Sequence, residues 1–449
     1  MTRNLMPESM TNLVEVVKSS FPGDEKLHKM FEACFTNTFN TTIKIRKDGT
    51  PFIITGDIPA MWLRDSASQI RPYLILAEKD EEMANLIEGI IQTQLNFILH
   101  DPYANAFNEE ANGNRYHDDK TKMTPLIWER KYEIDSLCYP IQLAYLFWKA
   151  TGRTSHFNET FKKAVNEIIK VWKIEQHHER DSEYRFERDH CPPSDTLTRE
   201  GKGSLVDFTG MTWSGFRPSD DACQYGYLIP SNMFAVVVLK YLGEIAEEVL
   251  KDKELKNQAL TLAKEIDEGI QKYGKVEHPK FGTIYAYETD GLGNYNFMDD
   301  ANVPSLLSLP YFGYCDMEDP VYVNTRRFIL SRENPYFYEG KIAKGIGSPH
   351  TPKQYIWHIA LAIQGLTAMN EGERQTILDM LKNTEAGTNL MHEGFHMDDP
   401  TQFTRPWFSW ANSMFSEFVL ALCGIYVKGS PLYNSGKNNN VLINATFRK

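Results

Sequence analysis

Six short polar stretches recur along the chain, and each is followed by an apolar segment with helical spacing. They are Arg64–Ser66, Glu133–Ser136, Ser219–Asp221, Asp299–Asn302, Ser348–Thr351 and Ser409–Asn412. Successive stretches lie roughly 50 to 85 residues apart, which is long enough for a helix, a loop and a returning helix. The pattern therefore predicts an all-α fold, an (α/α)6 barrel in which six inner helices are surrounded by six outer ones.

The same stretches have a simpler interpretation as helix caps. Asp, Ser, Thr and Asn are favoured at helix N-termini, so capping explains any single stretch as well as function does. Aromatic residues stand beside most of the six, which favours a binding site. If the six helices line a barrel, their N-termini meet at one mouth and give it a positive potential suited to carboxylates and sugar hydroxyls.

Further apolar segments show the three- and four-residue spacing of helices with one buried face. They span residues 79–99, 156–177, 231–273 (as two helices) and 354–369. Residues 41–45 and 52–55 are strand-like and predict a short peripheral hairpin, and the tail over 441–447 is similar. Because no Pro-, Ser- or Gly-rich linker interrupts the chain, a single catalytic domain over residues 1–449 is expected.

Composition excludes several classes of protein. A net charge of −12 argues against a nucleic-acid partner or an anionic membrane surface, since both require a basic face. The apolar run at residues 234–239 is too short to span a bilayer, and the N-terminus lacks the apolar core of a signal peptide. Six scattered cysteines form no CxxC pair. We therefore expect a cytoplasmic protein with reduced thiols, and a monomer.

Two acidic stretches far apart in the sequence are the strongest functional signal. Arg217–Asp221 and His392–His396 each place carboxylates among aromatic and polar residues. Cleavage of a glycosidic bond needs such a pair, because one carboxyl protonates the leaving oxygen while the other activates water or attacks carbon. The chain is thus predicted to cleave sugars with an oligosaccharide as its partner. Residue types alone leave Asp220 and Asp221 as equal candidates for the acid.

Metal and cofactor sites are not predicted. Possible ligands are Asp299, Asp300, His350, His396, Asp398 and Asp399. Their spacing matches no HExxH, HxH or EF-hand pattern of zinc or calcium sites. The sequence also lacks a phosphate-binding Gly-rich loop, a GxSxG elbow and a Rossmann fingerprint. Neither a metal nor an organic cofactor is expected.

Several ordered motifs make the prediction more specific. They are Gly56–Ser66, Trp128–Leu137, Gly215–Asp221, Met298–Pro304, Met391–His396 and Trp407–Asn412. In these motifs the chain resembles glycoside hydrolase family 125, and the resemblance covers nearly the whole sequence. It implies an exo-acting α-mannosidase of a bacterial and fungal family. Such an enzyme removes non-reducing α-1,6-linked mannose with inversion, on an (α/α)6 barrel and without a catalytic metal.

The resemblance assigns the general acid to Asp220 and the general base to Glu393. An acid must be protonated at working pH, so Asp220 needs apolar or like-charged neighbours that raise its pKa. Asp221, Phe216 and Tyr225 are expected to provide them. Glu393 should stay ionised beside a water, with the two carboxyl groups about 6.5 to 9.5 Å apart, as inversion requires.

The remaining polar and aromatic residues of these stretches are expected to hold the terminal sugar. They are Trp62, Arg64, Asp65, His117, Asp221, His350, His396 and Trp407. The arginine and its neighbouring aspartate suit vicinal hydroxyls, although a buried structural ion pair is the alternative. The tryptophans offer stacking faces or belong to the core. The histidines are hydrogen-bonding groups for hydroxyls or are satisfied locally. The segment 179–212 is expected to cover the mouth near the leaving sugar.

Two rival functions remain open from the sequence. One is another (α/α)6 enzyme, either an α-glucosidase or a phosphorylase that uses phosphate in place of water. The other is a sugar-binding protein without catalysis. Two opposed carboxylates in motif context argue against the second, since binding alone does not need them.

Overall fold

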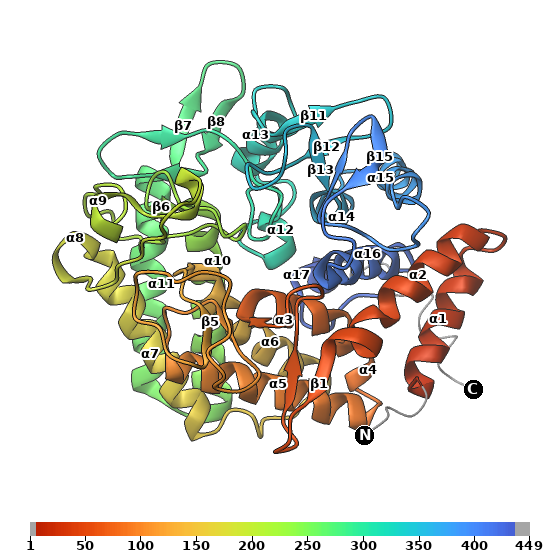
Figure 1. Cartoon of the computed structure of the whole chain (residues 1–449), viewed down its shortest axis with the longest axis horizontal. Helices are drawn as coiled ribbons and strands as arrows, with labels where there is room; N and C mark the ends of the chain where they lie inside the picture. The colour runs from red at the N-terminus through yellow and green to blue at the C-terminus, as the bar shows by residue number, and fades with distance from the viewer. Residues whose placement is uncertain (1–5, 436–449) are drawn as a thin grey trace.

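The computed structural model describes residues 6–435, and over this range the chain forms the predicted helical barrel (Figure 1). Each of the six polar stretches leads into a helix that is buried on nearly all sides, as an inner helix must be. These inner helices are α3 (Leu63–Ile70), α6 (Ile134–Thr151), α10 (Ile229–Ile245), α12 (Leu309–Phe312), α14 (His358–Leu366) and α16 (Ser409–Leu422). The apolar run that is too short for a bilayer lies within α10, and no helix of residues 6–435 has the length and apolarity to cross a membrane.

Six outer helices alternate with the inner ones along the chain. They are α5 (Glu81–His100), α7 (Glu159–Gln176), α11 (Lys253–Tyr273), α13 (Pro320–Ile329), α15 (Glu371–Asn383) and α2 (Glu25–Asn37). Each buries one face only. On α11, Leu255, Leu262 and Ile266 are buried, while Lys and Glu occupy the solvent side. Burial of each such aliphatic side chain contributes roughly 1.5–3 kcal/mol, so the apolar stripe holds the outer helix against its inner neighbour.

Side-chain N-caps distinguish the outer helices from the inner ones. The capping residues of the outer helices are Asp24, Asp80, Asn158, Asp252, Asp319 and Asn370. Within the described range, no inner helix receives a hydrogen bond from the side chain of its N-cap residue. The interpretation of the six polar stretches as helix caps is therefore wrong. The side chain of Arg64 instead contacts those of Glu133 and Asp135, where two of the inner helices begin.

The predicted helices agree well with those observed. Residues 79–99 and 156–177 correspond to α5 and α7, and residues 231–273 form the two helices α10 and α11. The segment 354–369 contains α14 but begins with a strand, β13 (Tyr355–Trp357), because its aromatic and β-branched residues pair with another strand.

The predicted hairpin is also present. It pairs β1 (Ile43–Ile45) with β2 (Pro51–Ile53) in antiparallel register. The tail at 441–447 lies outside the described residues.

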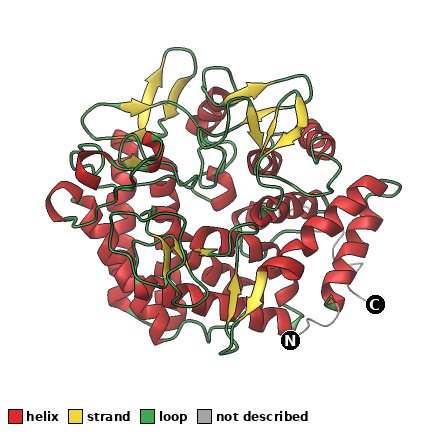
Figure 2. Ribbon diagram, in the orientation of Figure 1, coloured by secondary structure: helices red, strands yellow, loops and turns green. Residues whose placement is uncertain are grey.

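Short strands lie among the loops between the helices (Figure 2). Three sheets have three strands each: β3 (Met61–Trp62), β4 (Ala106–Phe107) and β5 (Ile127–Glu129); β6 (Tyr227–Leu228), β9 (Glu288–Thr289) and β10 (Tyr295–Asn296); and β13, β14 (Gly394–His396) and β15 (Asp399–Phe403). Two further hairpins are β7 (Lys275–His278) with β8 (Gly282–Tyr285), and β11 (Phe337–Glu339) with β12 (Lys344–Ile346). Strands β3, β6 and β13 run directly into α3, α10 and α14, so each sheet fixes where an inner helix begins.

The remaining helical segments are short or peripheral. They are α1 (Glu8–Ser20), α4 (Leu74–Ala77), α8 (His178–Asp181), α9 (Thr198–Gly201), α17 (Pro431–Ser435), two π-helical turns (Thr38–Thr42 and Ala246–Leu250) and two 3-10 turns (Arg71–Tyr73 and Pro193–Asp195).

The barrel closes where the segment before α3 meets the segment before α16. Gly56 forms a β-bridge with Phe408, and the N–H of Asp57 donates to the carbonyl of Trp407 at 3.1 Å. Gly56 has φ 138°, and a Cβ there would lie 2.2 Å from the Trp407 carbonyl oxygen. Only glycine allows so close an approach. The first and last inner helices are thus fixed side by side.

Candidate active site

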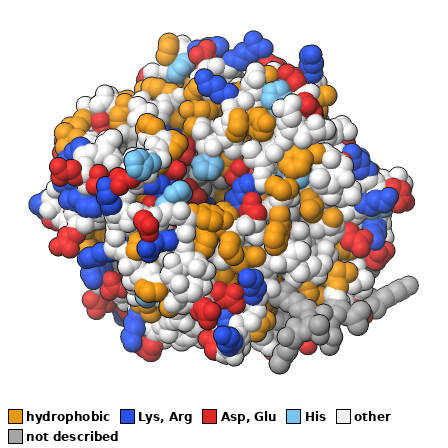
Figure 3. Space-filling model, in the orientation of Figure 1, with side chains coloured by type: hydrophobic (Ala, Val, Ile, Leu, Met, Phe, Trp, Pro, Cys, Tyr) orange, Lys and Arg blue, Asp and Glu red, His pale blue; other side chains and the backbone are white. Residues whose placement is uncertain are grey.

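A pocket with about 350 Å³ of empty space opens where the inner helices begin. In the space-filling view, acidic, basic and histidine side chains gather around a depression near the middle of this face (Figure 3). The lining residues are Thr55, Ile58, Trp62, Arg64, Asp65, Pro218, Ser219, Asp220, Asn302, His350, Trp357, Glu393, Arg405, Phe408 and Trp410. Both predicted catalytic carboxylates therefore line one pocket, although they come from distant parts of the chain.

A second pocket of about 590 Å³ adjoins the first. Its lining includes Tyr116, His117, Asp119, Trp128, Glu129, Lys131, Arg188 and Asp195. Trp62, Asp220 and His350 line both pockets. Asp220 consequently stands at the junction between the two. Arg188 and Asp195 belong to the segment 179–212, so this predicted cover of the mouth does contribute to the second pocket.

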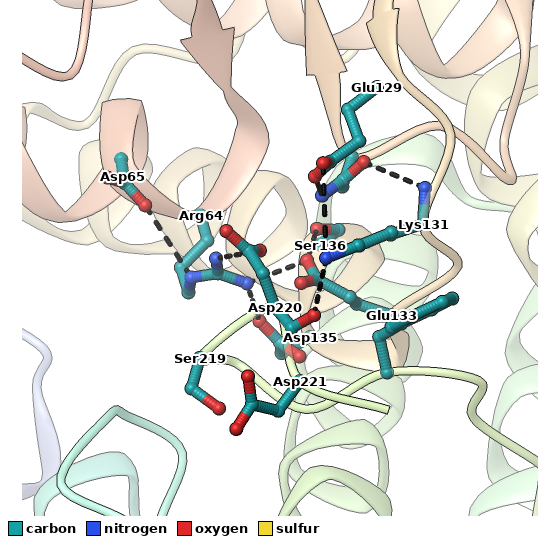
Figure 4. Close-up of polar contacts among 12 residues, drawn as sticks. Arg64, Asp65, Glu129, Lys131, Glu133, Asp135, Ser136, Ser219, Asp220 and Asp221 are labelled. Carbon is teal, nitrogen blue, oxygen red and sulfur yellow. Dashed lines mark hydrogen bonds and ion pairs between the residues drawn. The ribbon is translucent and has the colours of Figure 1, made fainter. Parts of the chain in front are cut away.

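Arg64 is the centre of a buried charge cluster at this junction (Figure 4). Its Nη1 lies 2.6 Å from Glu133 Oε2 and 3.0 Å from Asp135 Oδ2, and its Nη2 lies 3.2 Å from Asp220 Oδ1. Its Nε is 3.5 Å from Asp65 Oδ1. Burial opposes the charge, but the four carboxylates outweigh burial and raise the pKa of Arg64 well above its usual value. Arg64 thus makes buried ion pairs and also lines the first pocket, so its contact with a sugar hydroxyl stays a prediction.

Asp220 is held in an unusual backbone conformation. Its φ is +69°, in the left-handed region that costs a non-glycine residue about 1–3 kcal/mol, although Asp and Asn adopt it most readily. A tight turn maintains it, with the N–H of Asp220 donating to the Arg217 carbonyl at 2.9 Å. The Lys131 ammonium donates to the Asp220 carbonyl at 2.7 Å. The turn directs Asp220 and Asp221 away from each other (Figure 4).

The electrostatic surroundings of Asp220 differ from the prediction. Burial raises its pKa, but Arg64 and Lys131 together outweigh burial and bring the pKa below its usual value. The expectation that Asp221, Phe216 and Tyr225 would raise it is therefore wrong. Phe216 lies under the Lys131 ammonium, and Asp221 contacts a different partner.

Glu133 is a second buried carboxyl group that contacts Arg64, and it lowers the pKa of Asp220 further. Burial raises the pKa of Glu133 well above its usual value, against the pull of Arg64, and Asp220 and Asp135 raise it further.

Asp221 acts on the pocket only through His350. The two are joined by a 2.9 Å contact between His350 Nδ1 and Asp221 Oδ1. Asp221 is buried and lines neither pocket, whereas His350 lines both. Burial lowers the pKa of His350, but the hydrogen bond and charge of Asp221 outweigh burial and raise it to about 9. His350 is thus a cation between the two pockets at neutral pH.

This ion pair predicts a pH-dependent contribution to stability. Because the folded-state pKa of about 9 lies above the ordinary value of 6.5, the contribution is complete below about pH 6.5. It is lost as the pH rises through 9. Thermal unfolding of the wild type and of His350→Gln between pH 6 and 9.5 will measure it. The difference in melting temperature should shrink toward high pH, and a constant difference would contradict the assignment.

Glu393 immediately precedes β14 and is nearly buried. Its Oε1 lies 3.6 Å from Arg405 Nη1, so a positive charge stands beside this carboxylate. Arg405 is itself fixed by Asp57, with Nη2 and Oδ1 2.5 Å apart. The neighbouring His392 donates its N–H to His358 Nδ1 at 2.8 Å. Burial lowers the pKa of His358 to about 3, so its ring is neutral and able to accept this bond.

The structure does not place every predicted binding residue in the site. Trp62, Arg64, Asp65 and His350 line the first pocket, and His117 lines the second. Three others line neither pocket. Asp221 contacts His350 instead. His396 accepts a hydrogen bond from the N–H of Asp398, and Trp407 packs over Gly56 at the barrel closure.

Sequence reasoning missed several residues that line the first pocket. They are Thr55, Ile58, Pro218, Ser219, Asn302, Trp357, Arg405, Phe408 and Trp410. Five of the nine lie within the six polar stretches or within two residues of one, namely Pro218, Ser219, Asn302, Phe408 and Trp410. The other four, Thr55, Ile58, Trp357 and Arg405, lie further from any of these stretches. Among residues 6–435, no group of three or more His, Cys, Asp or Glu side chains is arranged to hold a metal ion.

A helical barrel whose mouth places two carboxylates among aromatic side chains is the arrangement of a glycoside hydrolase. Comparison with solved structures agrees at the level of the fold. A bacterial glucoamylase complexed with acarbose superposes with a TM-score of 0.59 at 12% identity, over 90% of this chain and 57% of that one. A family 78 rhamnosidase of Bacillus sp. GL1 gives 0.53 at 11% identity, over 88% and 34%. At such low identity, these two likenesses support the (α/α)6 barrel fold and nothing about the reaction.

Closer relatives define the family. The sequence model of the metal-independent alpha-mannosidases, glycoside hydrolase family 125, matches residues 24–420, and the chain belongs to this family. A Streptococcus pneumoniae member, solved in a non-productive complex with alpha-1,6-mannobiose, is 51% identical with a TM-score of 0.92, over 94% of this chain and 99% of that one. The meiotically up-regulated gene 157 protein of Schizosaccharomyces pombe is 42% identical, over 94% of this chain and 86% of its own length.

Proposed function

We propose that this protein is an exo-α-1,6-mannosidase that inverts the anomeric configuration, with Asp220 as general acid and Glu393 as general base. One observation carries the proposal. Asp220 lies at the junction of two adjoining pockets, and Glu393 lies within the first of them. A disaccharide that spans the junction brings its glycosidic oxygen to Asp220. The streptococcal relative was solved in a non-productive complex with α-1,6-mannobiose, which supports this choice of sugar and linkage.

The reaction follows from these positions. Asp220 gives its proton to the glycosidic oxygen as the bond from that oxygen to C1 breaks. Glu393 takes a proton from a water molecule, and the water oxygen forms the new bond to C1 from the opposite face. The products are β-mannose and the leaving sugar. Asp220 ends ionised and Glu393 protonated, and exchange with solvent restores both.

The two pockets divide the recognition of the substrate. The smaller one is surrounded by polar side chains and by Trp62, Trp357 and Trp410, and it suits a terminal mannose gripped through its hydroxyls and stacked on a ring face. The larger one suits the leaving sugar, with Trp128 and Tyr116 as its aromatic walls. His396 and Trp407 are not part of this assignment.

The proposal also covers the domain organisation, location, oligomeric state and cofactor requirement of the protein. We infer a single catalytic domain that acts as a cytoplasmic monomer on mannosides such as fragments of N-glycans. Hydrolysis is proposed to need neither a metal ion nor an organic cofactor, in keeping with the family description.

Proton NMR of the protein with α-1,6-mannobiose in chelator-containing buffer tests the function. We expect β-mannose to appear first and then to mutarotate, at a rate that the chelator leaves unchanged. Initial α-mannose would mean retention and would overturn the role given to Glu393. A rate that falls with chelator would contradict metal independence. Cleavage of α-glucosides in place of mannosides, or dependence on phosphate, would replace the proposed activity by a related one.

A further inference from the structure

Lys131 is a buried ammonium group to which the reaction described above assigns no part. It lies between β5 and α6, and only 2% of its surface is exposed. Its Nζ donates to the backbone carbonyl of Asp220 and to Asp195 Oδ1, each at 2.7 Å. The first of these contacts is made to the backbone of the acid and not to its carboxyl group. Lys131 therefore acts on the conformation of Asp220.

The backbone of Asp220 is held on both sides of its Cα atom (Figure 4). On the N-terminal side, its N–H donates to the Arg217 carbonyl at 2.9 Å, which maintains the φ of +69°. On the C-terminal side, its carbonyl accepts from Lys131 Nζ, which fixes the peptide plane that follows the residue. These two planes determine the direction of the Cα–Cβ bond. The position of the carboxyl group thus depends on both hydrogen bonds.

Loss of the Lys131 contact frees the second of these planes. A left-handed conformation is disfavoured for a residue with a Cβ and persists only where the surrounding structure holds it. Asp220 would then relax toward a more favourable conformation, and its carboxyl group would move away from the glycosidic oxygen. A displacement of about 1 Å is enough to lower the rate of an enzyme roughly 100-fold.

The charge of Lys131 by itself works against the acid. Burial raises the pKa of Asp220, but Arg64 and Lys131 lower it, so the ammonium favours the ionised form of a group that must carry a proton. Removal of this charge alone would increase the fraction of Asp220 that is protonated. A positioning role and a purely electrostatic role of Lys131 therefore predict opposite changes in rate when the residue is replaced.

The segment that covers the mouth keeps Lys131 in place. Asp195, which pairs with the ammonium, belongs to this segment of residues 179–212. The carbonyl of the preceding Ser194 accepts the N–H of Ala222 at 2.7 Å, just beyond the turn that contains the acid. The segment thus contacts the turn directly and also through Lys131. The ion pair holds the ammonium where it reaches the carbonyl of the acid.

We propose that Lys131 is a positioning residue of the general acid, which fixes the left-handed backbone of Asp220 through its carbonyl and so directs the carboxyl group to the junction of the two pockets. The inference rests on the proposed function and deepens it. Lys131 acts on the substrate through Asp220 and gives up no proton in the reaction. Asp195 supports it from the segment that covers the mouth.

Substitution Lys131→Met tests the inference with two substrates. Methionine has nearly the length of lysine but donates no hydrogen bond. In α-1,6-mannobiose the leaving sugar needs a proton, whereas in α-mannosyl fluoride the fluoride ion departs without one. At pH 7 we expect kcat for mannobiose to fall about 10- to 100-fold with KM within about threefold of the wild type, and the rate on the fluoride to stay within about threefold.

Arg188→Met provides the matched control. Arg188 is a buried cation that lines the same second pocket, and in the described part of the chain its ion pairs are with Asp119, Glu129 and Asp195 and not with Asp220. Its loss removes a cation from the pocket of the leaving sugar without freeing the acid. We therefore expect KM for mannobiose to rise while kcat stays within about threefold of the wild type.

The Lys131→Met protein is expected to fold, because the carboxylates that lose the ammonium keep another cation. Arg188 lies 2.9 Å from Glu129 Oε2 and 3.6 Å from Asp195 Oδ1. If the variant yields no folded protein, Lys131→Gln takes its place. Its amide remains polar, but its side chain is one bond shorter and stops short of the carbonyl. The same fall in kcat on mannobiose alone is expected.

Three results would each overturn the positioning role of Lys131. A rise in KM at unchanged kcat would make it a group that binds the leaving sugar. Equal losses on the two substrates would make it purely structural, and a rise in kcat on mannobiose would make its effect purely electrostatic. Absence of turnover by the wild type on both substrates would instead overturn the proposed function itself.

Discussion

Glu393→Gln is expected to lower kcat roughly 10²–10⁴-fold for α-1,6-mannobiose and for α-mannosyl fluoride alike. An amide has the size of the carboxylate but cannot take a proton from water. Fluoride leaves more easily than a sugar, but its departure does not replace the removal of a proton from water. The rate should therefore fall on both substrates. Binding should persist, because the rest of the pocket is unchanged, and calorimetry with mannobiose measures it beside the initial rates.

Asp220→Asn is the contrasting variant for this experiment. Asparagine tolerates the left-handed backbone at this position nearly as well as aspartate, so the turn should be preserved. We expect hydrolysis of mannobiose to fall strongly and hydrolysis of α-mannosyl fluoride to survive, because fluoride departs without a proton. In Glu393→Gln, by contrast, both rates should fall. A Glu393→Gln protein that retained most of its rate on either substrate would show that another group is the base.

Arg64→Met is expected to cost about 3–5 kcal/mol of folding free energy, the usual effect of removing one partner from a buried ion pair. The substitution keeps much of the side-chain volume but leaves Glu133 and Asp135 buried without their cation. Protonation of these carboxyls relieves part of the cost, so the loss should be greater at pH 8 than at pH 5. Thermal and urea unfolding at the two pH values will measure it.

Arg332→Met is the matched control for this stability measurement. Arg332 also contacts a carboxylate, Glu339, at 3.0 Å, but the two side chains are 84% and 45% exposed. Exposed pairs contribute about 0–1 kcal/mol, so this variant should melt close to the wild type. Equal losses in the two variants would mean that the cluster around Arg64 does not stabilise the fold.

Much of the architecture was accessible from the sequence, because it depends on periodic and local patterns. Apolar spacing identified α5, α7, α10 and α11, and the recurrence of polar stretches gave the barrel and its inner helices. Those stretches also contained seven of the fifteen residues that line the first pocket. The sequence left open whether they were caps. The outer helices have their own Asp and Asn caps, which appear as clearly in the sequence as the polar stretches do.

The electrostatics of the acid could not be predicted in the same way. Adjacency in sequence suggested Asp221 as the partner of Asp220, but a left-handed turn sends the two side chains apart. The groups that do act on Asp220 are Arg64 and Lys131, which are 156 and 89 residues distant in the chain. Such contacts arise only when the barrel closes. Arg405 was missed for a related reason, since its contact with Glu393 depends on a loop conformation that no motif marks.

The contact between Gly56 and Phe408 that closes the barrel determines when the active site is completed during synthesis of the chain. A nascent chain acquires Arg64 and Asp220 early in synthesis, but the pocket wall formed by Phe408 and Trp410 arrives only when most of the sequence has been translated. Until then the first inner helix has no final neighbour, and Arg64 lacks the Trp410 ring that lies 5.7 Å from its guanidinium carbon. Ribosome-bound chains that end before Phe408 should therefore fold in part without hydrolysing mannosides. Helices can form in an incomplete chain, whereas activity requires the last residues of the pocket. Enzymatic activity is thus the better measure of whether the barrel is complete.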